Sequence, residues 1–135
     1  MLPTPATLAG LPAFLEYFFG AVALVLIFAF VYSRVTPHNE LPLIRKGNVA
    51  AAIGFGGALI GYCLPLASAI SHSVSFSDML AWGGVALVVQ LGVLGVARLS
   101  VRHLFDDIKK GRAAAAVLLA AISLSAGLIN AASMG

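Results

Sequence analysis

Four long runs of apolar residues dominate the chain, and the last three carry no formal charge. The runs cover 14–33, 49–69, 79–97 and 113–132. A helix of roughly 20 apolar residues crosses ~30 Å of hydrocarbon. Because lipid offers no hydrogen-bond partners to the backbone, such runs form helices. The pattern therefore predicts an all-α integral membrane protein with four transmembrane helices, in a single membrane domain over 1–135.

The composition agrees with a chain that is solvated mainly by lipid. Hydrophobic residues make up 61% of the 135 residues and charged residues only 10%, whereas about 25% are charged in soluble domains. Cys63 is the one cysteine. It excludes a disulfide framework within the chain and a cysteine-rich metal site.

The positive charges predict how the helices are oriented. All eight basic residues lie in two connections: Arg34, Arg45 and Lys46 in the first, and Arg98, Arg102, Lys109, Lys110 and Arg112 in the third. By the positive-inside rule, both connections are cytoplasmic and both termini lie outside. This placement accounts for the net charge of +3 without a nucleic-acid partner. Residues 1–13 carry no Lys or Arg, so we expect the first run to remain in the mature protein.

The chain repeats itself weakly at an offset of 64 residues. Arg34 matches Arg98, and Lys46-Gly47 matches Lys110-Gly111. We therefore expect two parallel two-helix repeats, over 14–69 and 78–132. In the third connection, four apolar residues at helical spacing predict a short amphipathic helix in the membrane interface: Val101, Leu104, Phe105 and Ile108.

Several segments resemble one known family. They are 34–40, 44–52, 57–61, 64–66 and 127–132, together with Asp78, Trp82 and Gln90. In these segments the chain is similar to the YjfL family of bacterial inner-membrane proteins. The resemblance implies an inner-membrane location and a duplicated two-helix unit, and it implies no activity. Arg112 stands where the first unit has Asn48, so the two units are not equivalent.

Small residues follow one face of the helix over 49–69 and its entry. We expect a helix-packing seam made by Gly47, Ala51, Gly54, Ala58 and Gly61, with Gly127 on the last helix. Small residues let helix backbones approach closely, and packing drives association in lipid. The seam pairs these two helices within one chain or between chains, and a homo-oligomer is expected. The alternative is a stripe that lines a pore or faces a substrate.

Few polar residues lie within or beside the apolar runs. The amides of Asn48, Gln90 and Asn130 form either interhelical hydrogen bonds or a polar path through the membrane, because an unsatisfied amide in lipid is costly. The carboxylates of Glu16 and Asp78 are placed at the outer starts of two helices, where they complement the helix dipole. Alternatively, they ring an outer cavity.

No sequence motif indicates an enzyme. Neither HExxH, a Cys/His cluster, a P-loop nor GxSxG occurs, so we expect no catalytic residue, metal or cofactor. The sequence favours a non-enzymatic, self-associating membrane subunit or scaffold. The alternative is a component of a small channel or transporter. In either case, six basic residues are expected to contact anionic lipid headgroups or a cytoplasmic protein partner: Arg45, Lys46, Arg102, Lys109, Lys110 and Arg112.

Overall fold

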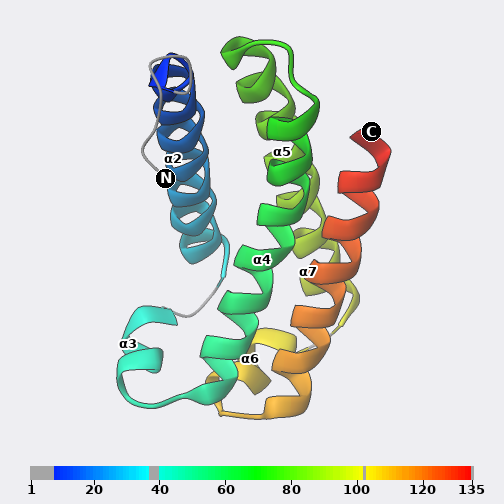
Figure 1. Ribbon diagram of the computed structural model, residues 1–135. Coiled ribbons are helices and arrows are strands. Elements are labelled where there is room, and N and C mark those ends of the chain that lie inside the picture. The colour runs from blue at the N-terminus through cyan, green and yellow to red at the C-terminus, as the bar shows by residue number, and fades with distance from the viewer. Residues whose placement is uncertain (1–7, 37–39, 102, 135) are drawn as a thin grey trace.

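The computed structural model describes residues 8–36, 40–101 and 103–134, and across these ranges the chain is helical without a strand (Figure 1). The long helices are α2 (Leu11–Val35), α4 (Val49–His72), α5 (Phe76–Ser100) and α7 (Ala113–Met134). The short helices are α3 (Glu40–Arg45) and α6 (Leu104–Lys109). All four long helices are long and apolar enough to cross a membrane. The predicted all-α class with four spans is confirmed, and the duplication of a two-helix unit stays a prediction.

The long helices extend a few residues beyond the apolar runs, and polar residues cap the starts of α4 and α5. At the start of α5, Ser75 Oγ accepts a hydrogen bond of 3.1 Å from the Asp78 backbone N–H. Asp78 Oδ2 in turn accepts one of 3.1 Å from the Val74 N–H. This reciprocal cap satisfies amides that have no partner within the helix.

The α4–α7 pair makes the most extensive helix contact in the bundle. A Cβ atom built on Gly57 would lie 2.6 Å from Ala120 Cα, and one on Gly61 would lie 2.5 Å from the Ser123 carbonyl oxygen. A Cβ on Gly127 would collide with the Gly61 carbonyl. Backbone therefore meets backbone here, and no side chain fits between the two helices.

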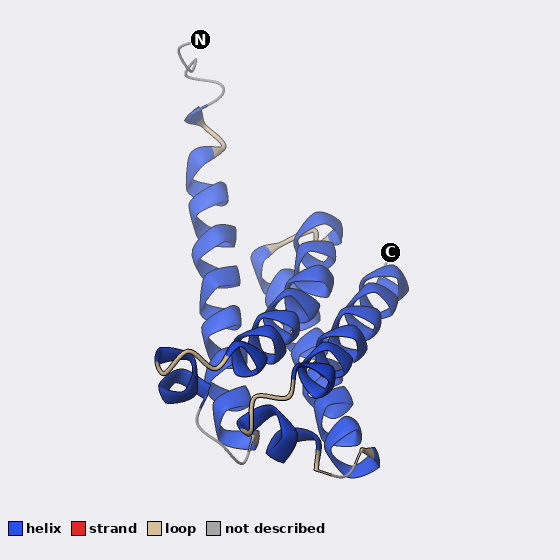
Figure 2. Cartoon of the chain, turned by 90° about the horizontal axis from the view of Figure 1, so that it is seen from below, coloured by secondary structure: helices blue, strands red, loops and turns tan. Residues whose placement is uncertain are grey.

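Larger side chains attach α2 and α5 to this pair. The rings of Phe28 on α2 and Tyr62 on α4 stack with centroids 5.0 Å apart. The Tyr62 hydroxyl donates a hydrogen bond of 2.9 Å to the Gly83 carbonyl of α5. Figure 2 shows α2 at the edge of the bundle, and it is the least buried of the four spans. Most of its outward side chains are large and apolar and therefore suited to lipid.

Both short helices lie at one end of the bundle, opposite the α4–α5 connection (Figure 1). The predicted short helix in the third connection is present as α6. Its apolar residues Leu104, Phe105 and Ile108 are buried where α6 packs against α4 and α7. The protein itself therefore covers this apolar face, and a position of α6 in the membrane interface stays a prediction.

The turns that follow α3 and α6 have the same design. Gly47 and Gly111 adopt φ values of +87° and +82°, which disfavour any residue with a side chain. The Gly47 N–H donates to the Ile44 carbonyl and the Gly111 N–H to the Ile108 carbonyl, both at 2.9 Å. This is the Schellman arrangement that ends a helix. In each case it directs the chain straight into the next span.

The contact at Gly57 gives a direct test of the α4–α7 packing. We expect Gly57→Ala to lower the free energy of unfolding by about 1–3 kcal/mol, because the added methyl group must push the two backbones apart. Gly56→Ala is the matched control, since a Cβ on Gly56 meets no atom within 4 Å. The control should be neutral or stabilising by up to about 1 kcal/mol, because Ala is the better helix former. Unfolding in a denaturing-detergent titration measures both, and equal stabilities would contradict the packing.

Candidate functional site

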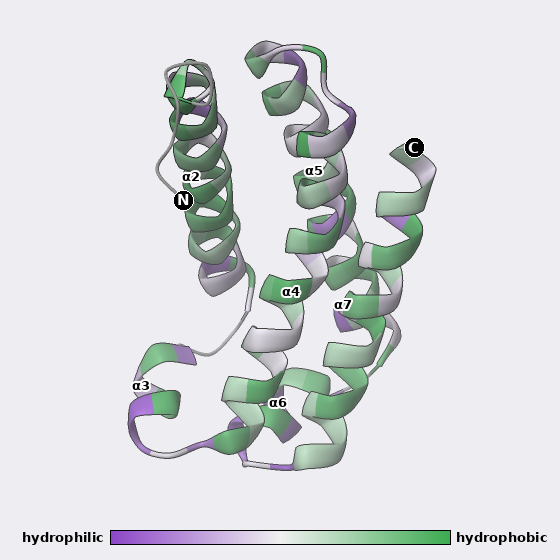
Figure 3. Ribbon diagram, viewed as in Figure 1, coloured by the Kyte–Doolittle hydropathy of each residue, from purple (hydrophilic) through white to green (hydrophobic). Residues whose placement is uncertain are grey.

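Exposed cations gather at the end of the bundle that carries α3 and α6. Figure 3 shows hydrophilic segments concentrated there, whereas the four long helices are mostly apolar. Arg102 lies outside the described residues. The other seven cations are all exposed: Arg34, Arg45, Lys46, Arg98, Lys109, Lys110 and Arg112.

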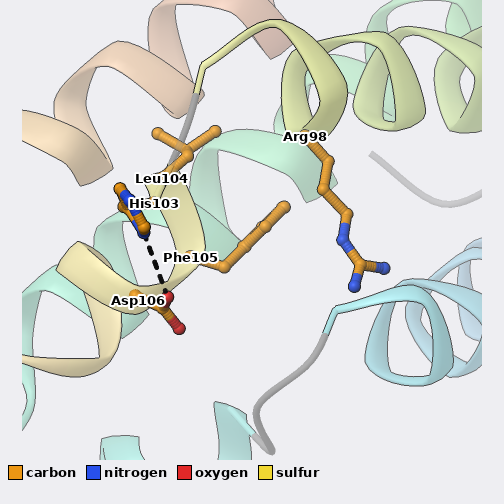
Figure 4. A pocket seen from close by; sticks show the side chains of 5 residues that line it. All are labelled: Arg98, His103, Leu104, Phe105 and Asp106. Carbon is orange, nitrogen blue, oxygen red and sulfur yellow. Dashed lines mark ion pairs between the residues drawn. The ribbon is translucent and has the colours of Figure 1, made fainter.

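The acidic side chains at this end already have partners within the chain. Asp107 Oδ1 lies 2.9 Å from Arg112 Nη1, and Asp106 Oδ2 lies 3.6 Å from His103 Nδ1 (Figure 4). Glu40 is buried and accepts a hydrogen bond from the Thr36 hydroxyl. Within the described ranges, no carboxylate lies in ion-pair distance of a lysine.

Arg98 serves to connect helix ends. Its Nη1 donates a hydrogen bond of 2.8 Å to the Val35 carbonyl and so joins the end of α5 to the end of α2. Arg98, His103 and Asp106 line a hollow of about 220 Å³. Figure 4 shows the Arg98 side chain on the opposite side of this hollow from His103 and Asp106. The Arg34 guanidinium lies 5.0 Å from the centre of the Phe30 ring, a cation–π contact. Arg98 and Arg34 thus both make contacts within the chain.

Asn48 joins the two turns at this end. Its Oδ1 accepts a hydrogen bond of 3.1 Å from the Ala51 N–H and caps α4. Its Nδ2 donates to the carbonyls of Ile108 at 3.2 Å and Lys109 at 3.1 Å. The Asn48 side-chain amide therefore caps the start of α4 and also holds the end of α6 against that start.

The other two amides lie deep in the bundle. Gln90 Nε2 donates a hydrogen bond of 2.8 Å to the Ser123 carbonyl, and Asn130 Nδ2 donates one of 3.5 Å to the Ala86 carbonyl. Both hydrogen bonds join α5 and α7: Gln90 donates from α5, and Asn130 donates from α7. The structure thus places both Gln90 and Asn130 at the contact between α5 and α7. Several turns of α4 separate Asn48 from Gly61, which packs against Gln90, so Asn48 does not join them.

Only one end of the Gln90 side-chain amide has a hydrogen-bond partner among the described residues. The side chain is 3% exposed, and its Oε1 has no hydrogen-bond partner in the part of the chain that the structure describes. Its Nε2 would lie 2.9 Å from a Cβ on Gly61, so the absence of a side chain at Gly61 makes room for the amide. The seam between α4 and α7 thus accommodates a polar group from α5.

Four of the predicted seam residues lie on α4 and are buried, whereas Gly47 lies before it. Ala51, Gly54, Ala58 and Gly61 are buried, and a Cβ on Gly54 would lie 3.4 Å from Leu119 Cδ2 of α7. Gly47 is a correction to the predicted set. It precedes α4, and a Cβ there would meet nothing within 4 Å. The turn requires its positive φ, and packing does not involve it.

The two outer carboxylates also differ from one another. Asp78 stands in the first turn of α5 and caps it. Glu16 is exposed on α2 beyond the first turn, because that helix begins at Leu11. Its expected position at a helix start is therefore corrected. Sequence reasoning also missed the burial of Glu40, which Thr36, four residues earlier, makes possible by donating a hydrogen bond.

Residues 6–134 match the family described as Domain of Unknown Function (DUF350). The chain belongs to this family. The DUF350 member is 46% identical over 127 residues to the inner membrane protein YjfL of Escherichia coli K12, which covers 94% of this chain and 96% of that protein. It is 32% identical over 75 residues to the transmembrane protein YshE of Bacillus subtilis, which covers 56% of each. No solved structure matches.

These comparisons confirm the resemblance to the YjfL family. The names of both relatives and the four apolar helices identify this DUF350 chain as a membrane protein. No group of three or more His, Cys, Asp or Glu residues suited to a metal ion occurs among 8–36, 40–101 and 103–134. The notable geometry of the DUF350 chain is thus the joined pair of turns at its basic end.

Two substitutions at Asn48 separate its two roles. Asn48→Asp keeps an oxygen that caps α4 and loses the donor to Ile108 and Lys109, whereas Asn48→Ala loses both. We expect Asn48→Ala to lower the free energy of unfolding by about 1–2 kcal/mol more than Asn48→Asp does, because the cap is lost only in the alanine variant.

The same detergent titration measures both variants. In addition, hydrogen exchange at α6 should increase in both, because each loses the bonds from Nδ2. Unchanged exchange at α6 in Asn48→Asp would show that the amide does not hold the two turns together.

Proposed function

We propose that this DUF350 protein is a non-catalytic membrane subunit that self-associates in the bilayer and presents its basic end to an acidic protein partner in the cytoplasm. The observation that carries the proposal is the charge balance at the α3/α6 end. Seven exposed cations lie there, while the local carboxylates are paired or buried. A surface with this excess of positive charge attracts acidic surfaces and speeds their association.

The orientation of the chain follows from the same charges. Because basic connections remain cytoplasmic, α3 and α6 face the cytoplasm in this proposal, and both termini and the α4–α5 connection face outward. The basic end is then also adjacent to anionic headgroups of the inner leaflet, which attract basic residues at the membrane surface.

A second glycine face supports self-association. The α4–α7 seam is closed within one chain, so it is not available to a neighbouring copy. On α5, a Cβ added at Gly84, Gly92 or Gly95 would meet no atom within 4 Å. Their spacing places the three glycines on one side of the helix. Small residues on an outward face allow a second helix to approach closely in lipid.

The amides give less support to a channel. Gln90 and Asn130 bond to helices of the same chain, as interhelical hydrogen bonds in membrane proteins do. Asn48 is engaged at the basic end. The three side chains thus serve separate contacts, which favours the subunit over a transport path.

Cysteine accessibility tests the proposed orientation. In a Cys63→Ser background, we expect Val74→Cys to react with a membrane-impermeant thiol reagent in intact cells, because Val74 is 91% exposed in the α4–α5 connection. Lys109→Cys should react only after the cells are permeabilised. Labelling of Lys109→Cys, and not of Val74→Cys, in intact cells would reverse the orientation and remove the basic end from the cytoplasm.

Single-molecule photobleaching of the full chain in lipid nanodiscs tests self-association. We expect the wild type to show more than one copy per assembly, and Gly92→Leu to shift the population to single copies by blocking the outward face of α5. Gly56→Leu is the matched control on α4, since a Cβ at Gly56 also meets no atom within 4 Å. Single copies of the wild type at every protein-to-lipid ratio would refute the proposal, as would equal losses in both variants.

A further inference from the structure

An open hollow of about 430 Å³ lies where the two basic turns meet. Its wall includes the ends of α3 and α6 and the start of α4. The residues that shape it are Lys46, Gly47, Asn48, Lys109, Lys110 and Gly111. No acidic residue lines it, and three of the residues around it are lysines.

The hollow is held in shape by backbone geometry. Gly47 and Gly111 both require positive φ, and Asn48 Nδ2 bonds one turn to the carbonyls of Ile108 and Lys109 in the other. Both N–H donors of the Asn48 amide are thereby used, and its oxygen caps α4. Asn48 consequently positions the wall, and a ligand must be bound by other groups.

Those other groups are the lysines and the first turn of α4. Lys46, Lys109 and Lys110 are exposed and make no ion pair with a described carboxylate. None of the five acidic residues of the sequence falls outside the described ranges. Val49, the first residue of α4, also lines the hollow. Its N–H belongs to a turn whose amides have no acceptor within the helix, at the positive end of the dipole.

Like charges gathered in this way repel one another unless an anion enters between them. Three lysines around one hollow suit a ligand with several charged oxygens, and lysine binds phosphate as a compact point charge. The start of α4 also marks the level where a membrane span begins, which is the level of lipid headgroups. A phosphate group presents more charged oxygens to these lysines than a single carboxylate does.

We propose that the hollow between the Lys46-Gly47 and Lys110-Gly111 turns binds one phosphate group, supplied either by an anionic phospholipid headgroup or by soluble phosphate. The site takes one anion per chain, so it requires neither the self-association nor the protein partner of the proposed function. Lys46, Lys109 and Lys110 hold the phosphate oxygens, and the start of α4 adds its N-terminal dipole.

Binding to the full chain distinguishes the two sources. Native mass spectrometry measures retention of phosphatidylglycerol against phosphatidylcholine, and equilibrium dialysis in phosphatidylcholine nanodiscs measures uptake of radiolabelled inorganic phosphate. We expect one anion per chain. The variant Lys46→Gln/Lys110→Gln should bind at least about tenfold more weakly, because two cationic contacts are lost.

Two further variants are the controls. Arg34→Gln/Arg45→Gln removes the same charge from the same end outside the hollow and should weaken binding less than about threefold. Lys46→Arg/Lys110→Arg keeps the charge and should keep binding. All four positions are exposed, so unfolding midpoints should stay close to the wild-type value. The lost Arg34–Phe30 contact costs at most about 1 kcal/mol.

Each outcome decides the proposal. Phosphatidylglycerol retained without uptake of inorganic phosphate identifies the headgroup as the source, and the reverse identifies soluble phosphate. Binding of neither anion overturns the proposal. An equal loss of anion binding in Lys46→Gln/Lys110→Gln and in Arg34→Gln/Arg45→Gln also overturns the proposal. Such a result would show only a diffuse attraction of anions to the basic end. Because one chain suffices for these measurements, a failure here leaves the photobleaching result unaffected.

Discussion

The backbone contact between α4 and α7 is the interaction on which the rest of the fold depends. In lipid, burial of apolar surface gives little reason for two helices to meet, and close packing must replace it. Gly57, Gly61 and Gly127 permit that packing because they place no atoms between the backbones. The side chain of Gln90 reaches the same contact from α5, and Ile108 brings α6 onto α4 beside Gly54. The basic turns are therefore held where the α4–α7 pair begins.

The charges show a division between side chains that stabilise the structure and side chains that remain available. Arg98 joins two helix ends, and Arg112 pairs with Asp107. The lysines have no such role among the described residues. Lysine is strongly hydrated and flexible, which suits reversible contact with an anion at a wet surface. The chain thus uses arginine mainly for internal contacts and keeps lysine for the surface between its two turns.

Much of the architecture follows from the sequence, because lipid imposes simple rules. The uncharged runs predict the four spans, the basic connections predict one basic end, and the spacing of Leu104, Phe105 and Ile108 predicts α6. The partners of individual residues do not follow in this way. Gly47 shares the spacing of the seam, yet it lies in a turn. Glu40 is charged, yet it is buried beside Thr36. Periodicity identifies a face of a helix, whereas these details depend on which other segment meets that face.

The position of the glycine contact along the chain has a consequence for biosynthesis. Gly61 is synthesised well before Gly127, and a ribosome that adds ~5–20 residues per second needs roughly 3–13 s for the stretch between them. Throughout this interval, the glycine face of α4 lacks the α7 backbone that it packs against in the finished chain. The nascent first half is thus an incomplete membrane protein, and its protection from wrong helix partners depends on how quickly translation delivers the second half.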